Sequence, residues 1–497
     1  MTTAGAPAWA PGAPTGRRIR NGVGMLVFRV NVTSPKQTAK AIAGALLGAL
    51  ALAPAASASS TQTTFFEAPR DLTASGTTEA GRKAALDTIA SLGASALRVN
   101  LRWYDVAPQP DSASKPAFNA ADPAQYNWGA YAQVIDDAKD RGWTVLISPS
   151  SAVPVWATAA KADTVTRPSA AEFKLFAQAV ARRFAAPNVL WSIWNEPNLE
   201  NFLRPQIVGG KFVSGGIYRE LYEAGRSGIK SVDGRAKVLF GETAPSGIAR
   251  KRQKPVAFLR DALCVTSKYK ADKKCGGKLT VDGFAHHPYR SVLGIPRSAD
   301  DVTYQVLSRY TRALDKIAKA KQIASNRPLY LTEFGVQSLP DKLFGVSLQQ
   351  QLEERARAEH IAYDNKRVKA FSQYLLTDDN PTTPGKVWGG FETGLFDHTG
   401  KAKPSLAGFR LTLDAKPGKK STALWGVVRP AAGAATSAVL ERKIGTKAWT
   451  TWKTVKTNSN GVFTTTDRKR SSVQYRYRWS SAALGELTAP AVRPFKG

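Results

Sequence analysis

Two glutamates in this chain each end a short run of apolar and β-forming residues, where an acidic side chain can do chemistry. Glu196 follows the run 191–195, and the next residue, Pro197, lacks the amide that a strand ladder needs. Glu333 follows the similar run 329–332. Both carboxyl groups are therefore expected at the carboxyl ends of buried parallel strands.

A pair of carboxyl groups in such places suits the cleavage of an acetal near neutral pH. One carboxyl must give a proton to the leaving oxygen, and the other must be ionised to meet an oxocarbenium-like centre. Enzymes that work by double displacement hold the two groups about 5 to 5.5 Å apart, so that the second acts as a nucleophile. The alternative is that each glutamate is a solvated loop residue, and two of them in matching frames argue against it.

The sequence around these glutamates resembles the retaining glycoside hydrolases of clan A, which are (β/α)8 barrels. The run 193–199, with Phe202 shortly after it, is most similar to family 39 and next to the cellulase-like family 5. The resemblance implies that Glu196 is the acid/base and Glu333 the nucleophile. It also implies that Asn195 holds the 2-hydroxyl of the sugar being cleaved, and it requires no metal or organic cofactor.

Other strand ends match the same clan. Arg98 matches its second-strand arginine, which would hydrogen-bond the nucleophile and keep it ionised; an ordinary salt-bridge arginine is the alternative. His287 and Tyr289 match its sixth-strand His-x-Tyr pattern, which implies a hydrogen bond from Tyr289 to Glu333. The preceding His286 leaves the register open, and either histidine can instead be structural.

Further candidates are two tryptophans and two more carboxylates. Trp156 and Trp388 are candidate platforms for stacking against sugar rings, and each is equally compatible with a packing role. Glu242 and Glu392 can bind sugar hydroxyls, or can replace the chosen pair if the roles are assigned wrongly.

Strand-like runs alternate with helix-like runs across residues 65–413, which favours a parallel sheet covered by helices. The expected strands are 65–66, 96–101, 145–148, the run ending at Glu196, 238–241, 283–287, the run ending at Glu333, and 370–376. Apolar stripes with helical spacing lie between them, for example at Phe173, Phe176, Ala177 and Val180. The predicted fold class is α/β, a (β/α)8 TIM barrel, whose catalytic groups come from the strands' carboxyl ends.

The N-terminal residues 1–58 are predicted to contain a secretory signal peptide. Lys36 and Lys40 precede the apolar run 41–53, and small residues at 56–58 suit a cleavage site. The run is too short for a permanent membrane anchor. We expect a secreted, extracellular protein without an integral membrane segment. The Ala-, Gly- and Pro-rich residues 1–24 leave a later start codon as an alternative.

Three parts are expected after the signal. Residues 59–414 form the barrel, 415–420 a linker, and 421–497 a small all-β sandwich that resembles immunoglobulin or fibronectin modules. In its last run, Val473, Tyr475, Tyr477 and Trp479 alternate with polar residues, which indicates a strand with one buried face.

The chain has two cysteines, Cys264 and Cys275. In an exported protein a disulfide that closes this loop is the favoured interpretation. A metal site is the alternative, but no histidine pair lies near at ligand spacing.

Charge bears on the partners. The chain carries a formal net charge of +32, and residues 415–497 hold 16 Lys or Arg against 3 acidic residues. Such a field favours an anionic glycan or cell-wall polymer, whereas nucleic acid is not expected because the charge is spread along an exported chain. A solvated basic surface with no partner is the alternative.

These features predict a secreted retaining glycosidase that cleaves β-linked poly- or oligosaccharides. The alternative is a non-catalytic carbohydrate-binding or wall-associated protein on the same barrel. The presence of Asn195, Glu196 and Glu333 together argues against that alternative.

Overall fold

The computed structural model describes residues 62–248, 251–291, 294–380, 390–431 and 433–494. The expected signal peptide and the candidate platform Trp388 lie outside these ranges. Within them, no helix combines the length and the apolar character that crossing a bilayer requires.

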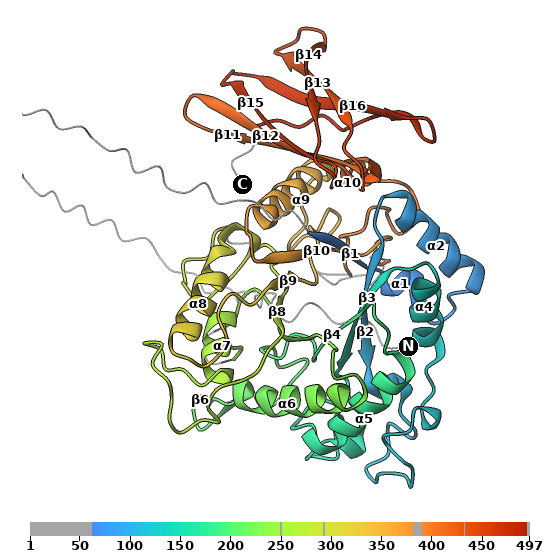
Figure 1. The fold of residues 1–497 in the computed structure, drawn as a ribbon, viewed down its shortest axis with the longest axis vertical. Helices are drawn as coiled ribbons and strands as arrows, with labels where there is room; N and C mark the ends of the chain where they lie inside the picture. The colour runs from blue at the N-terminus through green and yellow to red at the C-terminus, as the bar shows by residue number, and fades with distance from the viewer. Residues whose placement is uncertain (1–61, 249–250, 292–293, 381–389, 432, 495–497) are drawn as a thin grey trace, which may run out of the picture.

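Eight parallel strands close into a barrel, which confirms the predicted fold class (Figure 1). In chain order they are β1 (Thr63–Glu67), β2 (Ala96–Arg102), β3 (Thr144–Ser150), β4 (Val189–Ser192), β7 (Val238–Thr243), β8 (Gly283–His286), β9 (Leu329–Leu331) and β10 (Val368–Tyr374). The ring closes because β1 pairs with both β2 and β10. The short strands β5 (Ile207–Val208) and β6 (Lys211–Phe212) form a separate hairpin.

The barrel interior is a packed core. Each of the eight strands contributes one apolar side chain to a single cluster, namely Phe65, Ala96, Leu146, Leu190, Leu239, Ala285, Tyr330 and Ala370. Alanines lie on both sides of the large rings of Phe65 and Tyr330, and three neighbouring strands contribute leucines, so that the narrow space is filled. A filled barrel offers no channel, so function must lie at the ends of the strands.

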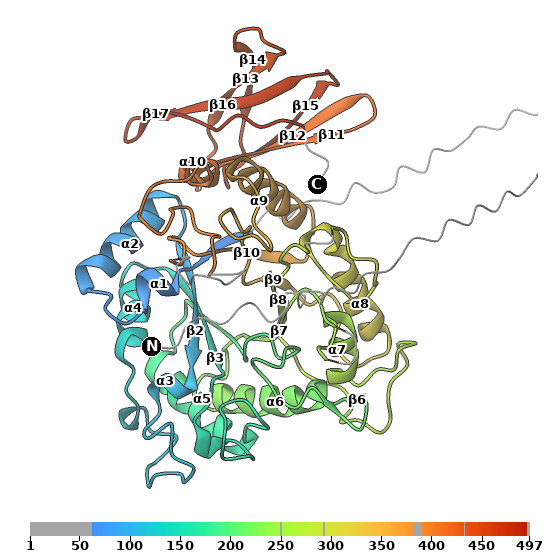
Figure 2. The ribbon, with the colours of Figure 1, turned by 180° about the vertical axis from the view of Figure 1, so that it is seen from behind.

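Helices surround the barrel on the outside (Figure 2). They are α1 (Pro69–Leu72), α2 (Glu79–Ser91), α3 (Trp103–Val106), α4 (Gly129–Asp140), α5 (Ala170–Phe184), α6 (Ser214–Val232), α7 (Pro255–Ala262), α8 (Ser308–Lys319), α9 (Leu348–Tyr363) and α10 (Pro404–Arg410).

Helix α5 shows how the sequence produces these helices. Ser169 caps its first turn by accepting a hydrogen bond from the amide of Glu172. The predicted apolar stripe, from Phe173 to Val180, is buried against the barrel. Helix α6 packs closely on α5 because Gly228 has no side chain: a Cβ there would lie 2.3 Å from the carbonyl oxygen of Lys174.

The first half of the expected linker 415–420 lies in a strand, and the second half forms a turn between two strands. Strand β11 (Leu411–Pro417) starts directly after α10, and it pairs antiparallel with β12 (Ser421–Val428). The charged Lys-Pro-Gly-Lys-Lys composition indicated a linker, but it marks the end of this strand and the turn that follows. Gly418 donates to the carbonyl of Ser421 at 2.7 Å across that turn.

The C-terminal domain is a sandwich of two antiparallel sheets, as predicted. One has the order β11-β12-β15 and the other β14-β13-β16-β17. The remaining strands are β13 (Ser437–Ile444), β14 (Thr450–Lys456), β15 (Val462–Arg468), β16 (Val473–Ser481) and β17 (Gly485–Thr488). The alternating residues Val473, Tyr475, Tyr477 and Trp479 of β16 are buried between the sheets.

The domain lies against α9 (Figures 1 and 2), and buried charged side chains connect the two. We call this set the interdomain cluster; its members are Arg355, Arg357, Glu359, His360, Asp414 and Arg429. Arg429 Nη2 lies 2.7 Å from Glu359 Oε1, and Arg357 Nε lies 2.8 Å from Asp414 Oδ2. His360 Nδ1 lies 2.6 Å from the same Asp414 oxygen.

A disulfide joins Cys264 and Cys275, as predicted, with their Cα atoms 5.4 Å apart. It closes the loop after α7. The guanidinium of Arg219 on α6 donates to Cys264 Sγ at 3.2 Å and so ties this loop to the helix layer.

Candidate active site

Six ionisable side chains meet at the carboxyl ends of the barrel strands, and we call them the catalytic cluster. Its members are Glu67 at the end of β1, Arg98 on β2, Glu196 after β4, Glu242 on β7, His287 after β8 and Glu333 after β9. Four of them were singled out from the sequence as site residues, and Glu242 was named as a further carboxylate.

The backbone at the end of β4 is shaped to present Glu196. Trp194 and Glu196 have positive φ angles of 76° and 41°, which non-glycine residues adopt only when their surroundings hold them. The amide of Trp194 donates to Pro149 O at 3.0 Å, and that of Glu196 donates to Glu242 O at 2.9 Å. The strand therefore ends with its last side chains turned toward the neighbouring strands.

Arg98 is the centre of the cluster and is fully buried. Its Nη1 contacts Glu67 and lies 2.9 Å from Glu333 Oε2, and its Nη2 lies 2.7 Å from Asn195 Oδ1. Burial alone would lower the pKa of this guanidinium, but the carboxylates around it raise the pKa further above its ordinary value. Arg98 thus remains a cation that supports several carboxylates at once.

Glu333 is held by donors on both of its oxygens. Tyr289 donates to Oε1 at 2.7 Å, and Arg98 donates to Oε2 at 2.9 Å. Tyr289 and Arg98 therefore both make the hydrogen bond to Glu333 that the resemblance implied. Such an arrangement stabilises an ionised carboxylate and orients it.

Glu196 has a different environment from Glu333. Its Oε1 lies 3.1 Å from Nδ1 of His287, and burial raises the pKa of this glutamate, although the histidine partly opposes the shift. The same Nδ1 lies 3.6 Å from Glu333 Oε2. The carboxylates of Glu196 and Glu333 therefore both lie within 3.6 Å of one ring nitrogen.

The open question of register is settled in favour of His287. His286 points to another set of partners, Thr243 Oγ1 at 2.9 Å and Val302 O at 2.8 Å. Burial lowers the pKa of His286 to about 3, so that ring is neutral. His286 is the structural histidine, and His287 is the one in the site.

Glu67 was missed in the sequence although a signal was present. It directly follows Phe65 and Phe66, the expected first strand, in the position that drew attention to Glu196 and Glu333. Burial raises the pKa of Glu67 to about 7, although Arg98 opposes the shift. What the sequence lacked was a motif around this residue.

The other candidates lie elsewhere. Trp156 is 2% exposed, stands edge-on to Trp103 at 5.6 Å between ring centroids, and donates to Pro108 O. This enclosed position is that of a packing residue. Glu392 contacts Gln337 at 3.1 Å in the loops after β9 and β10, so it belongs to a different set of side chains from Glu196 and Glu333.

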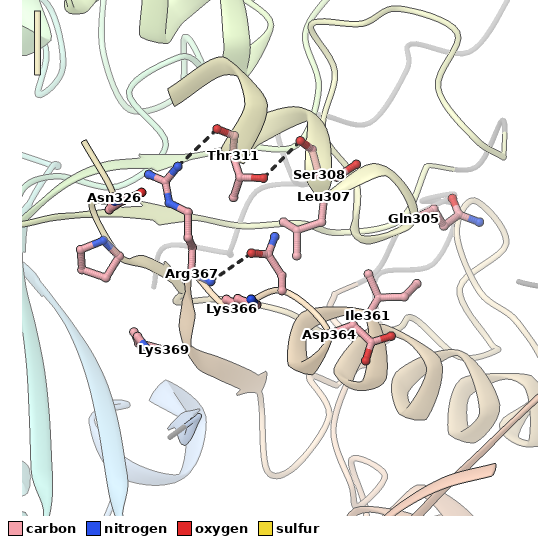
Figure 3. A pocket seen from close by; sticks show the side chains of 12 residues that line it. Gln305, Leu307, Ser308, Thr311, Asn326, Ile361, Asp364, Lys366, Arg367 and Lys369 are labelled. Atoms are coloured by element: carbon pink, nitrogen blue, oxygen red, sulfur yellow. Dashed lines mark hydrogen bonds between the residues drawn. The ribbon is translucent and has the colours of Figure 1, made fainter. Parts of the chain in front are cut away.

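A separate cavity of about 760 Å³ lies outside the catalytic cluster (Figure 3). Its lining includes Thr311 on α8, Asp364 after α9 and Arg367, which precedes β10. It therefore lies on the wall of the barrel near the amino ends of β9 and β10. Among the described residues, no group of three or more histidine, cysteine or acidic side chains is placed to hold a metal ion.

Comparison with known proteins identifies the family of the chain. The profile described as Cellulase (glycosyl hydrolase family 5) matches residues 57–363. Among solved structures, the chain is similar to a β-glucuronidase of Bacteroides uniformis, with TM-score 0.45 and 10% identity over 88% of this chain. This chain spans 47% of the length of that enzyme.

Two further solved structures are similar. One is the apo β-glucosidase 1317, with TM-score 0.45 and 19% identity over 68% of this chain and 88% of that one. The other is xylanase 10B of Thermotoga maritima, with TM-score 0.43 and 17% identity over 70% of this chain and 94% of that one. The curated proteins contain no match to the chain.

The closed barrel and the family profile show that the chain is a glycoside hydrolase of clan A, the class that the resemblance in the sequence implied. Within that class, the profile match covers more than half of the chain. The protein therefore belongs to glycosyl hydrolase family 5, a family of enzymes that hydrolyse glycosidic bonds.

Proposed function

We propose that the protein is a secreted retaining β-glycosidase that acts on a poly- or oligosaccharide. The observation that carries the proposal is that Glu196 and Glu333 both lie near Nδ1 of His287 but have different surroundings. Glu333 receives donors on both oxygens, whereas burial raises the pKa of Glu196. One group is thus suited to be the nucleophile and the other the proton donor.

In the first step, Glu333 attacks the anomeric carbon while Glu196 gives its proton to the leaving oxygen. Tyr289 and Arg98 hold the nucleophile in one orientation, so little freedom is lost in reaching the transition state. Asn195, whose Oδ1 accepts from Arg98, keeps its amide group available for the 2-hydroxyl of the sugar.

In the second step, Glu196 is ionised and takes a proton from the water that attacks the glycosyl-enzyme ester. Glu333 leaves as a carboxylate, and Arg98 again stabilises its charge. Glu196 ends the cycle protonated, so both carboxyl groups return to their starting forms. The chemistry needs only these side chains and water.

The exported location and the anionic character of the substrate are part of the proposal. The Cys264–Cys275 disulfide supports export, because such bonds persist in oxidising compartments. The net charge of +32 supports an anionic glycan or wall polymer as the substrate or as the surface on which the enzyme works.

Release of reducing sugar from neutral and acidic β-glycans by the purified protein tests the function. We expect release from at least one polymer, and none with Glu333→Gln. Glu196→Gln should retain turnover of aryl glycosides with activated leaving groups, which need little acid assistance. If Glu196→Gln loses equal activity on activated and unactivated substrates, the role of Glu196 as acid/base is contradicted. If the unmodified protein binds the polymers without releasing sugar, the proposal that it is an active glycosidase is contradicted.

A further inference from the structure

Glu242 is a buried carboxylate that the two-carboxylate mechanism does not use. Its side chain is 0% exposed, whereas Glu196 and Glu333 retain 5% and 8% of their surface. Its Oε2 accepts from Oγ1 of Thr332 at 2.7 Å and from Nη2 of Arg98 at 3.2 Å, and it lies 2.6 Å from Nε2 of His287. Hydrogen bonds from the Arg98 guanidinium and the Thr332 hydroxyl favour the ionised form of this carboxylate.

The backbone is distorted to aim this side chain inward. The pairing of β7 with β8 is irregular between Phe240 and Thr243, and Gly241 and Glu242 have positive φ angles of 122° and 47°. The carbonyl of Glu242 also accepts the amide of Glu196 at 2.9 Å. A bulge that re-aims one side chain beside a reactive group is typical of a functional position.

We propose that Glu242 is a positioning residue that acts on the acid/base through His287. Its carboxylate holds the imidazole doubly protonated, with Nδ1–H directed at Oε1 of Glu196 and Nε2–H donated to Glu242. The inference rests on the proposed role of Glu196, and it adds to that role a third residue that controls where the acid/base keeps its proton.

The chemistry follows from the direction of one hydrogen bond. When Nδ1 carries a proton, Oε1 of Glu196 can only accept, so the transferable proton is confined to Oε2. After that proton has passed to the leaving oxygen, the imidazolium stabilises the new carboxylate, and His287 itself loses no proton. A neutral His287 with its proton on Nε2 would instead accept the proton of Glu196 and hold it away from the sugar.

The electrostatics support this arrangement. Burial alone would raise the pKa of Glu242, but Arg98 and His287 outweigh it and lower the pKa to about 2. Burial alone would lower the pKa of His287, but Glu333, Glu196 and Glu242 outweigh it and raise the pKa to about 10. The charged or titratable groups around His287 are Glu67 on β1, Arg98 on β2, Glu196 after β4, Glu242 on β7, His286 on β8 and Glu333 after β9.

Nitrogen NMR of histidine-labelled protein tests the inference without any substrate. The chain has four histidines, and the signals of His287 can be assigned by their absence in His287→Gln. In the unmodified protein both ring nitrogens should remain protonated from neutral pH to about pH 10. In Glu242→Gln the titration of His287 should move down by about 2 pH units, because one adjacent charge is lost.

Two matched variants separate charge from structure. Glu242→Asp keeps the charge, and Thr332→Val removes a donor to Glu242 without changing charge, so the titration of His287 should stay near its original position in both. An unchanged titration in Glu242→Gln would overturn the proposal. If that variant does not fold, a neutral His287 ring at pH 7 in the unmodified protein would overturn it as well.

The pH dependence of kcat/KM tests whether the pair of Glu242 and His287 affects catalysis. In Glu242→Gln the alkaline limb should move to lower pH by the same amount as the His287 titration, and Glu242→Asp should restore it. The shift should be large for poor leaving groups and small for activated ones. If the His287 titration moves in Glu242→Gln while the alkaline limb of kcat/KM does not, the proposed effect of Glu242 on the acid/base is contradicted. Failure of the proposed function would appear separately, as no turnover by the unmodified protein.

Discussion

The catalytic cluster and the interdomain cluster are both buried networks of arginine, histidine and carboxylate, but their charge balance is opposite. The catalytic cluster sets four carboxylates against one arginine and one histidine. The interdomain cluster sets three arginines and one histidine against two carboxylates.

This difference decides how protons are distributed. In the interdomain cluster, the arginines outweigh burial and lower the pKa of Glu359, and His360 and Arg357 do the same for Asp414, so both are anions. In the catalytic cluster, the pKa of Glu242 is lowered to about 2 while that of Glu67 is raised to about 7. A shortage of cations separates the pKa values of neighbouring acids, which acid–base chemistry requires. A surplus of cations keeps every carboxyl group ionised.

The largest expected effect comes from removing a carboxylate where carboxylates are in excess. Glu333→Gln should lower kcat/KM by more than about 10⁴-fold, because the nucleophile is lost. The melting temperature should not fall, because the repulsion between Glu333 and the neighbouring carboxylates Glu67 and Glu196 is removed. Calorimetry and kinetics on the same preparation measure both, and a lower melting temperature would show that the cluster is built for stability.

Removing a carboxylate where cations are in excess should have the reverse outcome. Asp414→Asn leaves Arg357 buried without its counter-charge and should lower the free energy of unfolding by about 3–5 kcal/mol. Activity of the folded fraction should stay within about twofold, since Asp414 lies outside the site. Denaturant unfolding measures the loss.

The pair of Asp315 and Arg367 provides the control for that experiment, because the Asp315 side chain is 61% exposed, although that of Arg367 is only 16% exposed. Asp315→Asn should cost less than about 1 kcal/mol.

The effect of Asp414→Asn should also disappear in acid, because a lowered folded pKa contributes stability above the unfolded value, about 3.9, and loses it as the pH falls.

The catalytic cluster should lose stability as the pH rises from acid to neutral. Because the folded pKa of Glu67 is raised to about 7, its contribution is complete below the unfolded value, about 4.3, and is lost as the pH rises through 7. Glu67→Gln should therefore reduce the fall in unfolding free energy between pH 5 and pH 8 by on the order of 2 kcal/mol. An unchanged pH profile would show that Glu67 is ionised throughout.

Glu392 offers a comparison outside the cluster. Burial, with Asp341 and Asp378 nearby, raises its pKa to about 8. Glu392→Gln should therefore change the stability profile at a higher pH than Glu67→Gln, without the loss of turnover expected at the site.

A small expected effect distinguishes His360 of the interdomain cluster from His287 of the catalytic cluster. His360 shares Asp414 with Arg357, so His360→Gln should cost only about 1 kcal/mol of unfolding free energy. His287 bridges two carboxylates and should be required for turnover. A cost for His360→Gln equal to that of Asp414→Asn would place the stabilisation on the histidine instead of the arginine.

Much of this architecture was readable from sequence. The alternation of strand-like and helix-like runs predicted the barrel, and the period-two pattern of Val473, Tyr475, Tyr477 and Trp479 predicted a half-buried strand. The same reasoning failed at 415–420, because short-range composition does not reveal a strand partner. For Trp156 the sequence was equally compatible with stacking against a sugar ring and with packing, because the burial of a ring depends on what packs around it.

The sequence by itself determined which residues end the strands, and through the parallel barrel it determined that Glu196 and Glu333 share one face of the molecule. Only the tertiary structure decided how protons are shared there. Arg98, Glu242 and His287 come from different strands, and their contacts depend on barrel closure and on the bulge at Gly241. Electrostatic coupling decays with distance in space and not along the chain, so the roles of these residues become defined only when the strands meet.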